Sequence, residues 1–140
     1  MAHSIRLSGP WEVKPLDGLT FQDDGSTAPR RVQMPASWQS LFGYQGGNAV
    51  FIRYFHRPTG LKGQRITISL QEVRGDVNIR MNDTRIKEVQ VGEEYSLDVT
   101  NILSNHNHLE LQIHCEDMSA PCGLHRLVYL HIHEDYVRFV

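Results

Sequence analysis

Apolar and polar residues alternate with a period of two along much of the chain. The clearest runs are Ile66–Gln71, Val77–Asn82, Tyr95–Thr100, Leu109–Cys115 and Val128–His133. Because successive side chains of an extended strand point to opposite faces, each run predicts a strand with one buried face and one face in water. No long segment follows the period of an amphipathic helix, and residues 100–104 could form one helical turn at most.

Turn-forming residues separate these runs at short intervals, as at Arg74-Gly75-Asp76 and Asn82-Asp83. Roughly six to nine short strands with turns between them indicate an all-β fold, an antiparallel sandwich or barrel. The polar stretch from Leu16 to Arg31 predicts a long surface loop. Trp11 and Phe55 are expected to fill the core, because aromatic rings bury a large area in sandwich interiors.

Length and composition set limits on the function. A chain of 140 residues fits one domain spanning residues 1–140. The net charge of −2 lacks the basic excess of a nucleic-acid-binding protein, so a nucleic-acid partner is disfavoured. No stretch approaches the ~18 apolar residues that span a bilayer, and the N-terminus lacks the apolar core of a signal peptide. The sequence therefore predicts a cytoplasmic protein with no membrane partner.

The two cysteines, Cys115 and Cys122, lie close enough in sequence to face each other across a loop. Two cysteines at this spacing do not form a disulfide framework, and a cytosolic chain keeps its thiols reduced. Reduced thiols are therefore the expected state, and pairing remains open.

The stretch from Met34 to Phe55 carries the candidate binding residues. These are Trp38, Tyr44, Gln45, Asn48 and Arg53, set around three glycines ahead of an aromatic strand. An aromatic ring can stack on the C–H face of a sugar while amide and guanidinium groups bond its hydroxyls, which indicates a sugar-contacting edge. The alternatives are that Trp38 fills the end of the core and that Arg53 pairs with a carboxylate such as Asp98.

The sequence contains few signals for catalytic, nucleotide-binding or metal sites. No nucleophile elbow, phosphate-binding loop or dinucleotide-binding motif occurs, and the adjacent acidic pairs, such as Asp23-Asp24, lie in or beside turns. Among the eight histidines, His131 and His133 share a strand face, and His106 and His108 share a turn. Nothing in the spacing assembles a three-imidazole zinc site with His114 or His125, so no metal and no cofactor is expected.

Several short motifs in a fixed order resemble one family. They are Leu7–Trp11, Met34–Trp38, Tyr44–Gly46, Phe51–Phe55, Val77–Asp83, Leu97–Thr100, Asn107–Leu109 and Gly123–Leu130. In this order they are similar to the N-terminal sugar-binding domain of family 2 glycoside hydrolases, the β-galactosidase and β-glucuronidase group. The resemblance covers nearly the whole chain and implies the galactose-binding-like jelly-roll fold. It departs from the family at Asp83, where the family has Gly, and at residues 87–95, which replace a longer loop that leans toward the active site.

The resemblance also implies that catalysis and sugar binding belong to different domains. In the family an immunoglobulin-like domain and a TIM barrel follow this domain, and the barrel carries the two catalytic glutamates. Retaining glycoside hydrolysis needs two carboxyl groups about 5 Å apart. With neither further domain in these 140 residues, the chain is not expected to be an enzyme by itself.

Three functions remain open from the sequence. The first is a non-catalytic carbohydrate-binding or accessory module for galactosides or glucuronides, which could dock onto a catalytic partner or self-associate. The second is a structural or protein-interaction sandwich that has lost sugar binding. The third is a histidine-based metal or small-molecule site.

Overall fold

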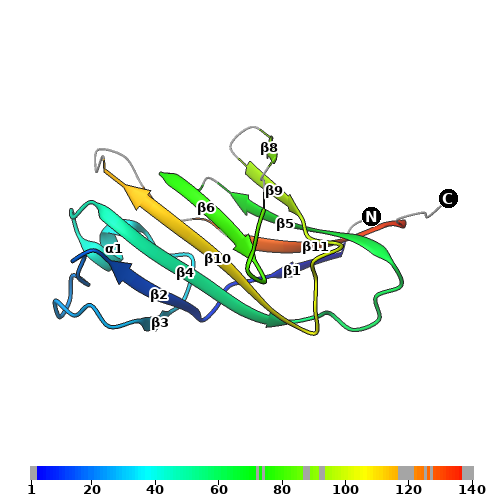
Figure 1. The fold of residues 1–140 in the computed structure, drawn as a ribbon, viewed down its shortest axis with the longest axis horizontal. Coiled ribbons are helices and arrows are strands. Elements are labelled where there is room, and N and C mark those ends of the chain that lie inside the picture. The colour runs from blue at the N-terminus through cyan, green and yellow to red at the C-terminus, as the bar shows by residue number, and fades with distance from the viewer. Residues whose placement is uncertain are drawn as a thin grey trace.

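The computed structural model describes residues 3–71, 73, 75–86, 89–91, 94–116, 122–124, 126 and 128–136. Within these residues the chain forms two antiparallel sheets that face each other, with one short helix, α1 (Trp38–Phe42), at one end (Figure 1). The predicted all-β antiparallel sandwich is confirmed.

The two sheets divide the strands of the described chain as follows. One sheet has the order β1 (His3–Arg6), β11 (Val128–Tyr136), β5 (Gln64–Gln71), β9 (Glu94–Asp98) and β8 (Val89–Val91). The other has the order β3 (Arg30–Val32), β2 (Trp11–Leu16), β4 (Gly47–His56), β10 (His106–Cys115), β6 (Asp76–Met81) and β7 (Thr84–Arg85). The five strands predicted from alternation correspond to β5, β6, β9, β10 and β11.

The longest strand pair joins β4 to β10. Their register runs without a break from His56 opposite His106 to Gly47 opposite Cys115. Phe51 and Leu111 face each other on the buried side, while the next pair, Ile52 and Glu110, faces outward. This pairing fixes which side chains of both strands reach the core and which reach water.

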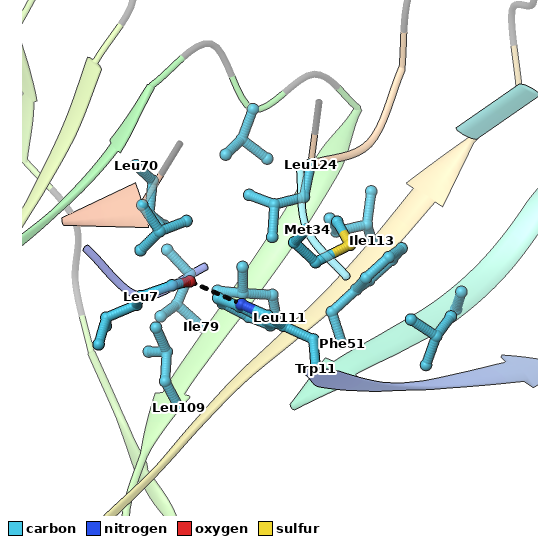
Figure 2. Packing of buried hydrophobic residues seen from close by; sticks show 14 of the residues in the cluster. Leu7, Trp11, Met34, Phe51, Leu70, Ile79, Leu109, Leu111, Ile113 and Leu124 are labelled. Atoms are coloured by element: carbon cyan, nitrogen blue, oxygen red, sulfur yellow. Dashed lines mark hydrogen bonds between the residues drawn. The ribbon is translucent and has the colours of Figure 1, made fainter. Parts of the chain in front are cut away.

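Trp11 lies in the middle of the core. Its ring is completely buried, and its Nε1–H donates a hydrogen bond to the carbonyl oxygen of Leu7 at 2.8 Å. Figure 2 shows this bond among aliphatic side chains from both sheets, including Leu70 of β5 and Leu109 of β10. The predicted core role of Trp11 is confirmed, whereas Phe55 is only partly buried against the core edge.

Helix α1 is an element that the sequence pattern did not predict. Its five residues are too few to show a helical period. The backbone N–H of Ser40 bonds the side chain of Ser37 at 3.1 Å, which caps the start of the helix. Gly43, with φ of 67°, ends it.

Cys115 and Cys122 form a disulfide, so the expectation of reduced thiols is wrong in this structure. The bond ties the end of β10 to the segment beneath α1, because the carbonyl oxygen of Cys122 accepts a hydrogen bond from the Trp38 backbone N–H at 3.3 Å. A Cβ atom at Gly75 would lie 2.5 Å from the His114 carbonyl oxygen, so only glycine fits against this end of β10.

The stretch between β2 and β3 is the long loop that the sequence predicts, and an ion cluster holds it. Arg30 binds Asp23 at 3.0 Å and Asp24 at 2.9 Å, and its guanidinium lies 3.8 Å from the centre of the Phe21 ring. The backbone N–H of Ser26, together with Arg30, holds the pKa of the Asp24 carboxyl below its usual value. No helix in the described part of the chain is long and apolar enough to cross a membrane.

Truncation of Leu111 should test the register of β4 and β10. Leu111→Ala removes a fully buried side chain and leaves a cavity, so we expect the free energy of unfolding to fall by about 2 to 5 kcal/mol. Ile52→Ala deletes the same number of carbon atoms on the outward face of the same sheet and should cost about 1 kcal/mol or less. Urea unfolding followed by circular dichroism measures both, and equal losses would contradict the assigned faces.

Candidate functional site

Trp38 lies beneath the glycine-rich loop rather than on its surface. Its side chain is fully buried, and its ring centre is 4.7 Å from that of Phe42. The Trp38 Nε1–H donates to the carbonyl oxygen of Gln45 at 2.7 Å, which ties the loop to the core. The prediction that Trp38 stacks on a sugar is therefore corrected, because no ligand can reach a ring that is withdrawn from solvent.

Tyr44 and Gln45 follow α1 and differ in what their side chains do. Tyr44 is 84% exposed, the most exposed of the large hydrophobic side chains that the structure describes. The Gln45 amide turns back to the protein, where its nitrogen donates to the carbonyl oxygens of Thr20 at 3.0 Å and Phe42 at 2.9 Å. Tyr44 is thus available to a ligand, while both amide hydrogens of Gln45 are used in hydrogen bonds within the protein.

Asn48 belongs to a line of hydrogen bonds at the same end of the sheet. Its Nδ2 donates to Asp17 at 3.3 Å, and its Oδ1 lies 2.9 Å from Nδ1 of His114. The other ring nitrogen of His114 lies 3.2 Å from a carboxylate oxygen of Glu116. Since both ring nitrogens face acceptor oxygens, both contacts are hydrogen bonds only when the ring carries two protons.

We call the surface formed by Asp17, Tyr44, Asn48, His114 and Glu116 the rim. The loop that carries Tyr44 runs directly against Glu116, because a Cβ atom at Gly46 would lie 3.5 Å from the Cα atom of Glu116. The loop that carries the exposed Tyr44 ring thus meets the end of the sheet that carries these carboxylate, amide and imidazole groups. This set can stack on an apolar ring face and bond several hydroxyl groups.

Arg53 does not belong to the rim. It lies five residues further along β4, about 17 Å away at the usual rise of a strand. Its Nη1 donates to the carbonyl oxygen of Tyr54, and it makes no pair with Asp98, which instead accepts from Thr100. The alternative that Arg53 pairs with Asp98 is therefore wrong. Burial lowers the pKa of Arg53.

The described histidines do not assemble a metal centre. His131 bonds the hydroxyl groups of Ser4 at 2.7 Å and Ser69 at 3.0 Å, and His133 bonds Thr67 at 2.8 Å. Among the residues that the structure describes, no group of three or more His, Cys, Asp or Glu could hold a metal ion. His125, the remaining candidate from the sequence, lies outside these residues.

Sequence reasoning missed Asp17, His114 and Glu116 as members of the rim. Alternation places His114 on the outer face of its strand, but the sequence does not say which strand lies beside it. The register of β4 and β10 sets His114 opposite Asn48, although 66 residues separate them. Only the strand pairing brings these groups together.

The fold is shared with part of several large glycosidases. An FMN-binding β-glucuronidase from Facaelibacterium prausnitzii L2-6 superposes with a TM-score of 0.73 at 23% identity over 94% of this chain and 22% of that enzyme. A β-glucuronidase from Ruminococcus gnavus gives 0.74 at 14% identity over 94% and 28% of the two chains. A glycosyl hydrolase family 2 member from Bacteroides cellulosilyticus DSM 14838 gives 0.70 at 18% identity over 92% and 20%.

These superpositions establish the fold and confirm, at that level, the resemblance to family 2 glycoside hydrolases. The chain spans less than a third of the length of each of these enzymes. No protein-family model matches the sequence, and a search of curated proteins found no match.

The different roles of Gln45 and Tyr44 can be separated by stability measurements. Gln45→Ala removes the hydrogen bonds to Thr20 and Phe42, so we expect the free energy of unfolding to fall by about 1 to 2 kcal/mol. Tyr44→Ala removes an exposed ring and should change it by no more than about 0.5 kcal/mol. Thermal and urea unfolding of both variants measure the difference, and a large loss for Tyr44→Ala would mean that its ring packs on the protein.

Proposed function

We propose that this protein is a non-catalytic carbohydrate-binding or accessory domain that contacts a sugar at the rim. The observation that carries the proposal is Tyr44, an aromatic side chain that is 84% exposed on the loop whose Gly46 lies against Glu116, where a hydrogen-bonded row of polar groups ends. Exposing a large ring costs free energy unless a partner covers it. A sugar suits this place because one face of its ring is apolar and its hydroxyl groups need directional partners.

The polar groups of the rim favour a hydroxylated ligand over a purely apolar one. Asp17 and Glu116 each retain carboxylate oxygen atoms that can accept from hydroxyl groups, and the side chain of Glu116 is 85% exposed. Asn48 and His114 hold these groups in place from two paired strands, so little ordering is required on binding. Galactosides and glucuronides are the sugar classes to test first, because the structural relatives named above include β-glucuronidases.

An accessory role fits the share of the structural relatives that the chain covers. It matches between 20% and 28% of those three enzymes. In this proposal the domain contacts the sugar. Glycoside hydrolysis would be carried out by a catalytic domain, either in a partner protein or in the same polypeptide. Self-association is a further arrangement that the proposal allows.

A second candidate function is a structural or protein-interaction sandwich. Two of the five predicted sugar-contacting residues favour it. Trp38 and Gln45 donate their side-chain N–H groups to backbone carbonyl oxygens of the protein and so stabilise the loop. In that case Tyr44 would anchor a protein partner instead of a sugar.

Nuclear magnetic resonance titration of the full chain tests the carbohydrate proposal. Galactosides, glucuronides and soluble polysaccharides should produce saturable shifts at Tyr44, Asn48 and His114, and a glycan array extends the panel. Tyr44→Ala should weaken the binding of any sugar so identified by about tenfold, as truncation of an interface tyrosine commonly does.

Tyr54→Ala is the matched control. It removes a second ring, 57% exposed, from the far part of β4, and sugar binding at the rim should survive it. If the sugar shifted only the NMR signals of Tyr54, the sugar site would lie at that part of β4 and not at the rim. No saturable shift across the whole panel would falsify the carbohydrate proposal, and elution as a dimer that Tyr44→Ala dissociates would favour the interaction role.

A further inference from the structure

A second site lies where strands β2 and β4 separate. Their last registered pair is Glu12 with Ile52, so the following residues of β4 extend past the end of β2. A pocket of about 180 Å³ opens at this point. It is lined by Pro10, Glu12, Arg31, Arg53 and Tyr54.

The charged groups of this pocket make no ion pair with one another, although Glu12 lies opposite Arg31 in the register of β2 and β3. Arg31 and Glu12 make no hydrogen bond or ion pair with any residue that the structure describes, and Arg53 donates only to the carbonyl oxygen of Tyr54. Two guanidinium groups therefore share the pocket with one carboxylate. Its net charge is positive although the whole chain carries −2.

Arg53 is the group that gains most from an anion. Its Nε atom is shielded from solvent and has no hydrogen-bond partner. The cation has therefore lost part of its hydration without receiving a carboxylate in exchange, which is an unfavourable state for a charge. An anion in the adjoining pocket would offset this cost through its charge and through the remaining guanidinium N–H groups.

The walls of the pocket select for a small organic anion. Pro10 and Tyr54 also line the pocket, so part of its wall is uncharged. The volume is below the roughly 300 to 1,000 Å³ of sites for drug-sized ligands, so the occupant is small. The planar fork of an arginine matches a carboxylate, which can accept two parallel hydrogen bonds.

We propose that the pocket between Arg53, Arg31 and Tyr54 binds a small carboxylic acid in its ionised form, with its flat or apolar body against Tyr54 and Pro10. This site is separate from the rim. It stands whether or not the rim binds a sugar, because it shares no residue with the rim.

Titration of the ¹⁵N-labelled full chain with sodium benzoate at low ionic strength tests the site. We expect saturable shifts of the backbone amides of Arg53 and Tyr54 and of the Arg53 side-chain Nε–Hε signal. Benzamide, which has the same shape without the charge, should bind at least about tenfold more weakly. Inorganic phosphate should also bind more weakly, because it has no body to cover Tyr54.

Charge variants decide the assignment. Arg53→Gln and Arg31→Gln should each weaken benzoate binding, Arg53→Gln by about tenfold or more. Glu12→Gln should strengthen it severalfold, because it removes a repelling carboxylate. Arg80→Gln deletes one positive charge from the exposed part of β6 and should leave the affinity within about twofold.

Opposite effects at Glu12 and Arg31 support the proposal even if Arg53→Gln fails to fold. The proposal is overturned by any of three results. These are benzamide or phosphate binding as tightly as benzoate, equal effects of Arg31→Gln and Arg80→Gln, or no saturable shift at Arg53 and Tyr54.

Discussion

The register between β4 and β10 is the constraint on which the rest of this structure depends. The two strands pair over their whole length, so the alternation in each reinforces the other: Phe51 meets Leu111 inside the sandwich while Ile52 meets Glu110 outside. A slip of one residue would turn every apolar side chain of one strand into water. The core around Trp11 and the placement of the polar groups at both ends of the sheet follow from the same pairing.

The pair of β4 and β10 runs the length of the sheet, so the rim and the Arg53 pocket lie on the same strand, β4. At the start of β4, the Asn48–His114 pair supports the rim, where carboxylates dominate and a single aromatic ring stands free. Further along β4, beyond its last residue paired with β2, Arg53 lines a pocket that contains two arginines and one glutamate. The separation of about 17 Å along the strand exceeds the Debye length of roughly 8 Å at physiological salt, so each surface acts largely independently of the charge on the other.

The sequence predicted most of the fold because strands with one wet face carry their burial pattern in the alternation itself. It did not reveal α1, since five residues are too few for a helical period to repeat. Nor did it reveal the disulfide, since the pairing of Cys115 with Cys122 depends on how the chain turns between them. At the site, residue type could not separate Trp38 from Tyr44. Both are aromatic residues beside glycines, and only the path of the loop buries one and exposes the other. His114 and Glu116 reach the rim through strand pairing across 66 residues, which no local pattern encodes.

The position of Trp38 has a spectroscopic consequence. Both tryptophans are fully buried and donate their Nε1–H groups to backbone carbonyl oxygens, so neither fluorophore can touch a molecule bound at the surface. Trp11 is surrounded by the aliphatic core, whereas the acceptor of Trp38 is Gln45, the residue next to Tyr44. The emission of Trp38 therefore reports movement of the loop above it and not contact with a ligand. A ligand that docks without moving the loop contacts neither tryptophan ring, and a shift of the Trp38 emission band signals that the loop has moved.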